Sequence, residues 1–214
     1  MSMKLRDGET ILFIGDSITD CGRMGMERPL GCGYVKFFRD MLIAREPARR
    51  VTIINKGISG NTVVDLQNRW ADDVLRHRPD WLSVKIGIND LHRTLANTPE
   101  AVPPELFEKT CDEVLSRTRA KLPACRILLI DPFYISNDLC PNSARSEVLK
   151  LLPRYLATVH AMSRKYRTRL VETHAMFQKL LKHHEADRFC PEPVHPNPTG
   201  HLAIAEAVYE ALSR

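Results

Sequence analysis

The sequence predicts an α/β fold in which helices cover both faces of a parallel β-sheet. Short apolar, β-branched segments alternate with longer segments that carry apolar residues at helical spacing. The short segments are apolar almost throughout, which is typical of strands buried on both faces. The length of 214 residues fits one domain over 1–214, and the sequence shows no repeat, low-complexity segment or linker.

Five strands are expected, each from a run of apolar and β-branched residues bounded by turn residues. The last of them is short, and the first is followed at once by a polar turn. They cover residues 10–15, 50–55, 81–87, 126–131 and 170–172.

Helical periodicity fills the intervals between these strands. Thr62 and Asp65 resemble a capping box at the start of one helix. Pro153 suits the first turn of a later helix, and Asn197-Pro198 is a good N-cap and N1 pair for the last one, which is expected to bury Leu202. The predicted helices cover 33–45, 62–77, 104–121, 152–167, 175–184 and the segment from 198 onward.

Composition excludes several classes of protein. The chain is 43% hydrophobic and 27% charged, and its net charge of +5 comes from basic residues scattered among acids, so no nucleic-acid partner is expected. No apolar run reaches the roughly 20 residues of a membrane span, and residues 1–6 hold no apolar signal-peptide core. Six irregularly spaced cysteines are typical of reduced thiols, which predicts a cytoplasmic protein.

The segment 14–20, Ile-Gly-Asp-Ser-Ile-Thr-Asp, places Ser17 directly after the first strand. The carboxyl ends of parallel strands are where open α/β sheets bind ligands. Ser17 is therefore a candidate nucleophile, although Gly-Asp-Ser is also ordinary turn chemistry.

Two further polar blocks follow the second and third strands. The block 55–62 contains Gly60, whose backbone N–H is a candidate donor to an acyl oxygen. The block 87–90 contains Asn89, whose side-chain amide is a second candidate donor. Taken alone, the first block is also compatible with a strand-to-helix turn and the second with an Asx turn.

His195 lies in a proline-rich loop before the last helix and is a candidate general base. In a doubly wound sheet this loop and the three strand ends converge on one rim. The combination of a hydroxyl, a base and two hydrogen-bond donors predicts acyl transfer through a serine nucleophile.

In order, the four blocks resemble the SGNH subgroup of the GDSL hydrolases, and Ser17, Gly60, Asn89 and His195 match its four name-giving residues. The stretches 12–23, 55–70, 79–90 and 132–135 are similar to the intracellular bacterial acetyl xylan esterases. The resemblance implies a flavodoxin-like three-layer α/β/α sandwich, and an oxyanion hole built from the Ser17 N–H, the Gly60 N–H and the Asn89 amide. It implies no metal or cofactor, a small acylated carbohydrate as substrate, and a homo-oligomer.

One departure concerns the residue that orients the base. The family places an aspartate three residues before the histidine, and this chain has Glu192 there. Glutamate also serves in Ser-His-Glu hydrolases, so Glu192 is the expected orienting acid. Asp187 is the rival, and a backbone carbonyl or water is a third option.

Other departures concern the substrate. His92 stands where the acetyl xylan esterases tend to have a tryptophan, and the loop from Cys21 to Cys32 is shorter than in that branch. The leading prediction is a serine esterase for short acyl esters. The alternatives are a thioesterase or lysophospholipase on the same scaffold, and a carbohydrate-binding relative without activity. Cys190, His183, His184 and His195 fit no standard zinc spacing.

Overall fold

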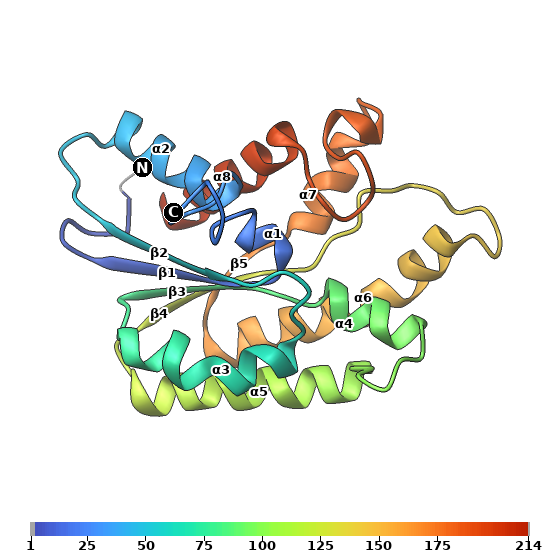
Figure 1. Cartoon of the computed structure of the whole chain (residues 1–214), viewed down its shortest axis with the longest axis horizontal. Coiled ribbons are helices and arrows are strands. Elements are labelled where there is room, and N and C mark those ends of the chain that lie inside the picture. The colour runs from blue at the N-terminus through green and yellow to red at the C-terminus, as the bar shows by residue number, and fades with distance from the viewer. Residues whose placement is uncertain (1–2, 214) are drawn as a thin grey trace.

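A parallel five-stranded sheet forms the centre of the computed structural model, which describes residues 3–213 (Figure 1). The strands stand in the order β2-β1-β3-β4-β5, and every neighbouring pair is parallel. This confirms the predicted sheet, with boundaries shifted by up to two residues. The strands are β1 Thr10–Gly15, β2 Thr52–Gly57, β3 Trp81–Lys85, β4 Arg126–Ile130 and β5 Arg169–Val171.

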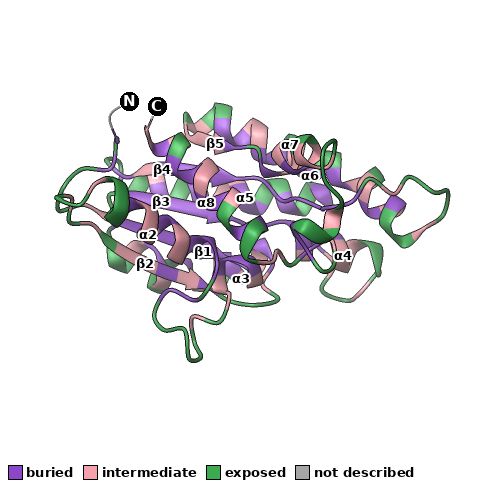
Figure 2. Cartoon of the chain, turned by 90° about the horizontal axis from the view of Figure 1, so that it is seen from above, coloured by how far each residue is buried: buried purple, intermediate pink, exposed green. Residues whose placement is uncertain are grey.

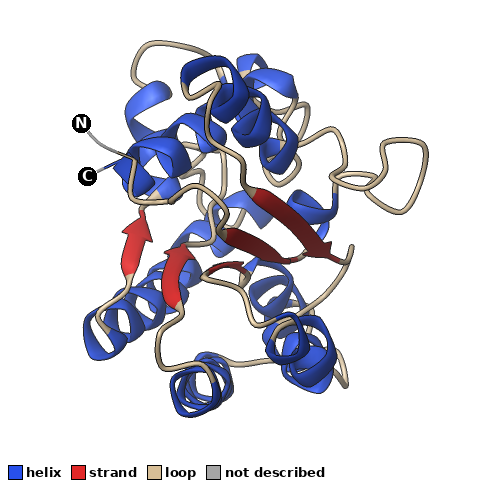
Figure 3. Ribbon diagram, turned by 90° about the vertical axis from the view of Figure 1, so that its left-hand side faces the viewer, coloured by secondary structure: helices blue, strands red, loops and turns tan. Residues whose placement is uncertain are grey.

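Helices cover both faces of the sheet and complete the three-layer sandwich (Figures 1 and 3). The helices α2 and α8 pack against each other on one face, while α3, α5 and α6 form the layer on the other. The helices are α1 Ser17–Asp20, α2 Tyr34–Arg45, α3 Val63–Asp73, α4 Ile88–Leu95, α5 Pro104–Lys121, α6 Ala144–Tyr166, α7 Thr173–Leu180 and α8 Pro198–Ser213, and short 3-10 turns cover Leu75–His77 and Ala186–Arg188.

The chain reverses direction across the sheet at β1. From β1 it passes through α2 to β2 at the edge, and it then returns through α3 to β3 on the other side of β1. The carboxyl ends of β1 and β3 therefore lie at a topological switch point, where α/β sheets bind ligands. Figure 2 shows that the central strands β1, β3 and β4 are buried almost throughout, as predicted, whereas the edge strands β2 and β5 are only partly buried.

Helix α6 differs from the prediction, which placed Pro153 in its first turn. The helix begins eight residues before the predicted start at 152, at Ala144, so Pro153 lies in its interior. Ser143 is the N-cap, and its side chain accepts a hydrogen bond from the Ser146 N–H. The prediction was wrong because it used the proline as a start signal and overlooked this serine cap.

Two other expectations are corrected. Leu202 was expected in the core with Ala205, Val208 and Leu212, but it is 47% exposed. The other three are buried as expected, together with Ile204. Helix α4 was not predicted at all, because 88–95 is short and carries five polar residues. By contrast, the predicted capping box of α3 is confirmed: Thr62 and Asp65 each accept a hydrogen bond from the other's backbone N–H.

Candidate active site

Ser17 is the first residue of α1 and lies immediately beyond the carboxyl end of β1. Asp16 is the N-cap of this short helix, and its Oδ1 accepts a hydrogen bond from the Ile18 N–H at 3.0 Å. Gly15 is required because a Cβ at this position would come within 2.2 Å of the Lys85 carbonyl oxygen. Strand β1 can thus turn directly into α1, which presents the serine at the rim of the sheet.

A buried ion pair between Lys85, at the end of β3, and Asp16 stabilises this turn. The Lys85 Nζ lies 3.3 Å from Asp16 Oδ2, and both side chains are 0% exposed. The Lys85 ammonium also lies 4.9 Å from the centre of the Phe133 ring. The backbone of the serine turn is therefore held by a charged contact that water does not reach.

The structure brings Ser17, His195 and Glu192 into one hydrogen-bonded row. The Ser17 Oγ is 2.9 Å from His195 Nε2, and His195 Nδ1 is 2.5 Å from Glu192 Oε1. Because an ionised carboxylate only accepts, the Nδ1–H donates to Glu192 and leaves Nε2 free to accept the serine proton. This is the geometry of a nucleophile, a base and an orienting acid.

Glu192 is also held by the backbone of its own turn. The Val194 N–H donates to Oε2 at 3.0 Å, and the His195 N–H donates to Oε1 at 2.7 Å. Although partial burial raises the pKa of Glu192, these hydrogen bonds and the imidazole lower it below its ordinary value. The extra methylene of glutamate is thus taken up in a turn that fixes the carboxylate in its ionised form.

Asp187, the rival acid, lies on an exposed 3-10 turn away from this row. Its backbone carbonyl, not its carboxylate, accepts a hydrogen bond from Asn197 Nδ2 at 3.2 Å. His195 Nδ1 is therefore adjacent to Glu192 and not to Asp187.

The two candidate oxyanion donors lie on adjoining loops. Gly60 has a φ of +79°, a conformation that favours glycine, and within residues 3–213 its N–H has no hydrogen-bond partner. Asn89 lies in the first turn of α4, and its Nδ2 donates to the Asn61 carbonyl at 3.0 Å. The second hydrogen of this amide is available to a substrate. The Ser17 N–H, in the first turn of α1, has no partner within its helix.

Side-chain contacts tie these loops together. The carboxylate of Asp20, in α1, accepts hydrogen bonds from the Ser59 N–H at 3.2 Å and its hydroxyl at 2.7 Å. Arg93, in α4, donates to the Gly60 carbonyl at 2.8 Å. The serine helix, the glycine loop and the asparagine helix are therefore mutually braced.

His92 lies beside the triad, and its ring meets the edge of Tyr134 at 6.1 Å between centres. Burial lowers the pKa of His92; the Glu192 carboxylate opposes this shift, and His195 adds to it. These interactions place a neutral imidazole and a phenol ring near the catalytic loop. Tyr134 belongs to the stretch 132–135, which the sequence comparison singled out without assigning it a role.

Sequence reasoning missed three buried polar groups around the site. Lys85 and Asp16 form the ion pair described above, and Asp90 accepts a hydrogen bond from the Val63 N–H at 2.9 Å. Burial raises the pKa of Asp90 to about 7. The sequence did contain a signal for the ion pair: Lys85 ends an otherwise largely apolar strand, and a buried lysine needs a partner of opposite charge.

The candidate zinc ligands are engaged elsewhere. The Cys190 thiol donates to the Glu192 carbonyl at 2.5 Å, and the His184 ring packs against Phe189. Over the described part of the chain, no group of three or more histidine, cysteine or acidic side chains is arranged to hold a metal ion. No described helix is both long and apolar enough to cross a bilayer.

Comparison with known proteins gives the family. The profile of the GDSL-like lipase/acylhydrolase family matches residues 13–203. The chain belongs to this family. It is therefore a carboxylic ester hydrolase. The acetylxylan esterase of Geobacillus stearothermophilus is 36% identical over 214 residues, which cover 96% of this chain and 94% of that esterase.

Solved structures of similar proteins agree with the fold. The crystal structure of the same Geobacillus esterase matches with a TM-score of 0.89 at 35% identity, covering 99% of this chain and 97% of that one. An α/β hydrolase from the metagenome of Lake Arreo matches with a TM-score of 0.88 at 33% identity, covering 99% and 98%. Catalytic mutants of the Geobacillus esterase replace a serine, an aspartate or a histidine, and the last two positions are three residues apart. Glu192 and His195 have the same spacing.

Proposed function

We propose that this chain removes acetyl groups from carbohydrates such as xylo-oligosaccharides, through an acyl-enzyme on Ser17. The observation that carries the proposal is the row from Ser17 Oγ to His195 at 2.9 Å and from His195 to Glu192 at 2.5 Å. The relation to the Geobacillus acetylxylan esterase supports the choice of substrate.

In the first half of the reaction, Ser17 Oγ attacks the acetyl carbon while His195 Nε2 takes its proton. Glu192 accepts from Nδ1–H and stabilises the imidazolium that forms. The Ser17 N–H, the Gly60 N–H and the Asn89 amide donate to the oxyanion. His195 then protonates the departing sugar hydroxyl, which leaves the acetyl group on Ser17.

In the second half, water attacks the acetyl-enzyme. His195 Nε2 takes the proton of the water, the same three donors hold the second oxyanion, and acetate leaves as Ser17 recovers its proton. The side chains of His195 and Glu192 are 59% and 48% exposed, so solvent reaches the base directly.

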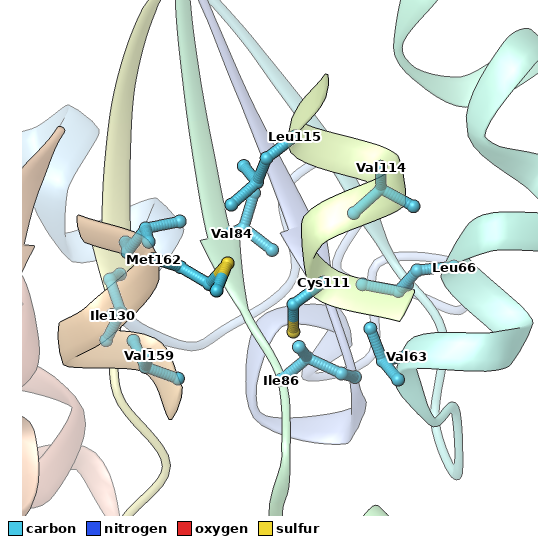
Figure 4. Close-up of a pocket in the computed structure, with 11 residues that line it drawn as sticks. Val63, Leu66, Val84, Ile86, Cys111, Val114, Leu115, Ile130, Val159 and Met162 are labelled. Atoms are coloured by element: carbon cyan, nitrogen blue, oxygen red, sulfur yellow. The ribbon is translucent and has the colours of Figure 1, made fainter. Parts of the chain in front are cut away.

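The apolar interior contains one small cavity among the described residues that line it. Val84, Ile86, Cys111 and Met162 point into a cavity between the sheet and helices α3, α5 and α6 (Figure 4). Its volume of about 20 Å³ is close to that needed by a single water molecule. None of its lining residues belongs to the catalytic row or to the oxyanion donors, so this cavity is a feature of the core and not the acyl site.

Rates of hydrolysis of p-nitrophenyl esters of increasing chain length test the proposal. We expect the highest kcat/KM with acetate and near-complete loss in Ser17→Ala. Acetate release from acetylated xylo-oligosaccharides, measured beside the same variant, tests the carbohydrate part. A maximum at long chains would instead support a thioesterase or lysophospholipase, and binding without acetate release would support a carbohydrate-binding relative.

We also propose a cytoplasmic homo-oligomer formed by one domain over 1–214. All six cysteines are free thiols, which suits a reducing compartment. Met24, Met26 and Leu139 are large apolar side chains at the surface, available to a second copy. Light scattering coupled to size exclusion measures the assembly, and a monomer at micromolar concentration would contradict it.

A further inference from the structure

Two cysteines bracket the loop that follows the catalytic serine. The Cys21 Sγ lies 3.5 Å from the Cys32 Sγ, and the Cys32 N–H donates to the Cys21 carbonyl at 2.9 Å. Cys21 is half-buried, whereas Cys32 is exposed. The two thiols are therefore in contact, on backbone segments that are already hydrogen-bonded, and one of them faces solvent.

His201 completes this cluster from helix α8. The Tyr34 N–H donates to His201 Nδ1 at 3.2 Å, so the neutral ring carries its proton on Nε2. The Nε2 lies 3.4 Å from the Cys21 Sγ and donates to it. Burial lowers the pKa of His201 to about 4, which keeps the ring neutral. An N–H group is thus aimed at the inner sulfur and fixes its position beside Cys32.

Close packing on Cys21 keeps the two thiols together. A Cβ at Gly33 would lie 2.8 Å from the Cys21 Cβ and 3.0 Å from His201 Cε1. A Cβ at Gly31 would lie 2.6 Å from the Cys21 carbonyl oxygen. Any side chain at either position would push the segment with Cys32 away from Cys21.

We propose that Cys21 and Cys32 are a redox modification site, which closes to an intramolecular disulfide in exchange with a small aliphatic disulfide and thereby lowers esterase turnover. None of the catalytic roles assigned above uses either thiol. The chemistry requires only the two thiols and the external disulfide.

The exchange proceeds in two displacements. The Cys32 thiolate attacks one sulfur of the small disulfide, a mixed disulfide forms, and one small thiolate leaves. Cys21 then attacks the Cys32 Sγ, its proton passes to the departing second thiolate, and the Cys21–Cys32 bond forms. The two protein thiols are oxidised, and the small disulfide is reduced to two thiols. Burial raises the pKa of Cys21 to about 12, so Cys32 reacts first and Cys21 resolves the intermediate.

Oxidation acts on Ser17 through helix α1. Cys21 is the C-cap of this four-residue helix, and its N–H donates to the Ser17 carbonyl at 2.9 Å. A disulfide requires the sulfurs to approach from 3.5 Å to about 2.05 Å, which pulls on this cap. Displacement of a nucleophile by a fraction of an ångström is enough to slow acyl transfer. This part of the inference rests on the proposed function.

Mass spectrometry tests the bond directly. The chain is incubated with glutathione disulfide, alkylated and digested with trypsin without reductant. Cleavage after Arg23 separates the two cysteines, so the disulfide would join a peptide ending at Arg23 to the peptide that carries Cys32. Cys140→Ser, which removes an exposed thiol elsewhere, is the control and should still give the joined peptides. Glutathione on Cys140 of the unmutated protein, without joined peptides, would overturn the proposal.

Hydrolysis of p-nitrophenyl acetate tests the link to turnover. We expect a fall of about fivefold or more in kcat on oxidation and recovery with dithiothreitol. Cys32→Ser should retain its rate in glutathione disulfide. Equal inhibition of this variant, or joined peptides with unchanged kcat, would overturn the link to Ser17. If the chain proved not to hydrolyse esters, the peptide analysis would still decide whether the disulfide forms.

Discussion

The buried pair of Lys85 and Asp16 offers the sharpest test of how the serine turn is held. In Lys85→Met the methionine fills similar space, but the Asp16 carboxylate is left without its cation in a site that is 0% exposed. At 3.3 Å and an effective dielectric constant of about 20, the lost attraction is about 5 kcal/mol. Leaving one member of a buried pair uncompensated typically costs 3–5 kcal/mol, so we expect a loss of about 4 kcal/mol in the free energy of unfolding.

Equilibrium urea unfolding measures this loss, and a double-mutant cycle assigns it. Asp16→Asn keeps an oxygen to cap Ile18 but removes the charge, so the double variant should recover most of the stability lost in Lys85→Met. Lys56→Met is the control, because the partner Asp73 is partly exposed and also pairs with Arg69 at 2.8 Å; here we expect about 1 kcal/mol or less. If the loss in the double variant equalled the sum of the losses in Lys85→Met and Asp16→Asn within about 0.5 kcal/mol, the two side chains would not be coupled and the reasoning would be refuted.

Three further predictions concern the acid, a buried carboxyl and the cavity. Glu192→Gln removes the charge that stabilises the imidazolium and should lower kcat on p-nitrophenyl acetate by roughly 10²–10⁴-fold, while Asp187→Asn stays near wild type; a large loss in Asp187→Asn would transfer the role to that residue. Burial raises the pKa of Asp90 from 3.8 to about 7, so the folded chain holds a proton that the unfolded chain has lost, and stability should fall as pH rises from about 4 to about 7. The difference of about 3 in pKa corresponds to about 4 kcal/mol, and Asp90→Asn should flatten this dependence in urea unfolding at several pH values; parallel curves would contradict it. Val84→Ile adds one methyl group to the cavity of about 20 Å³ and should raise stability by about 1 kcal/mol, whereas Val84→Ala should lower it; a loss in both would mean that the space is already filled.

Sequence periodicity located the layers of the fold because the strands are mostly apolar and most helices have one apolar face. It failed at α4, where eight residues with five polar side chains form a helix. It also failed at the start of α6, because a proline in the middle of a long helix and a proline in its first turn leave similar local patterns. Tertiary packing of α6 against α5 and α4 maintains the helix across Pro153.

The sequence by itself determined which side chains are available for chemistry: a serine, a glycine and an asparagine each near the end of a strand, and a histidine in a distant loop. Parallel strands carry such residues to one rim, so their convergence follows from the order of elements alone. Only the tertiary structure decided which acid faces His195, because that depends on how the backbone of 192–195 turns to donate its N–H groups to Glu192. Only the tertiary structure likewise showed that Lys85 pairs with Asp16 and that His201 contacts Cys21, because these residues are far apart in the chain. The contact of Cys21 with Cys32 depends on the path of the loop between them, which no local pattern encodes.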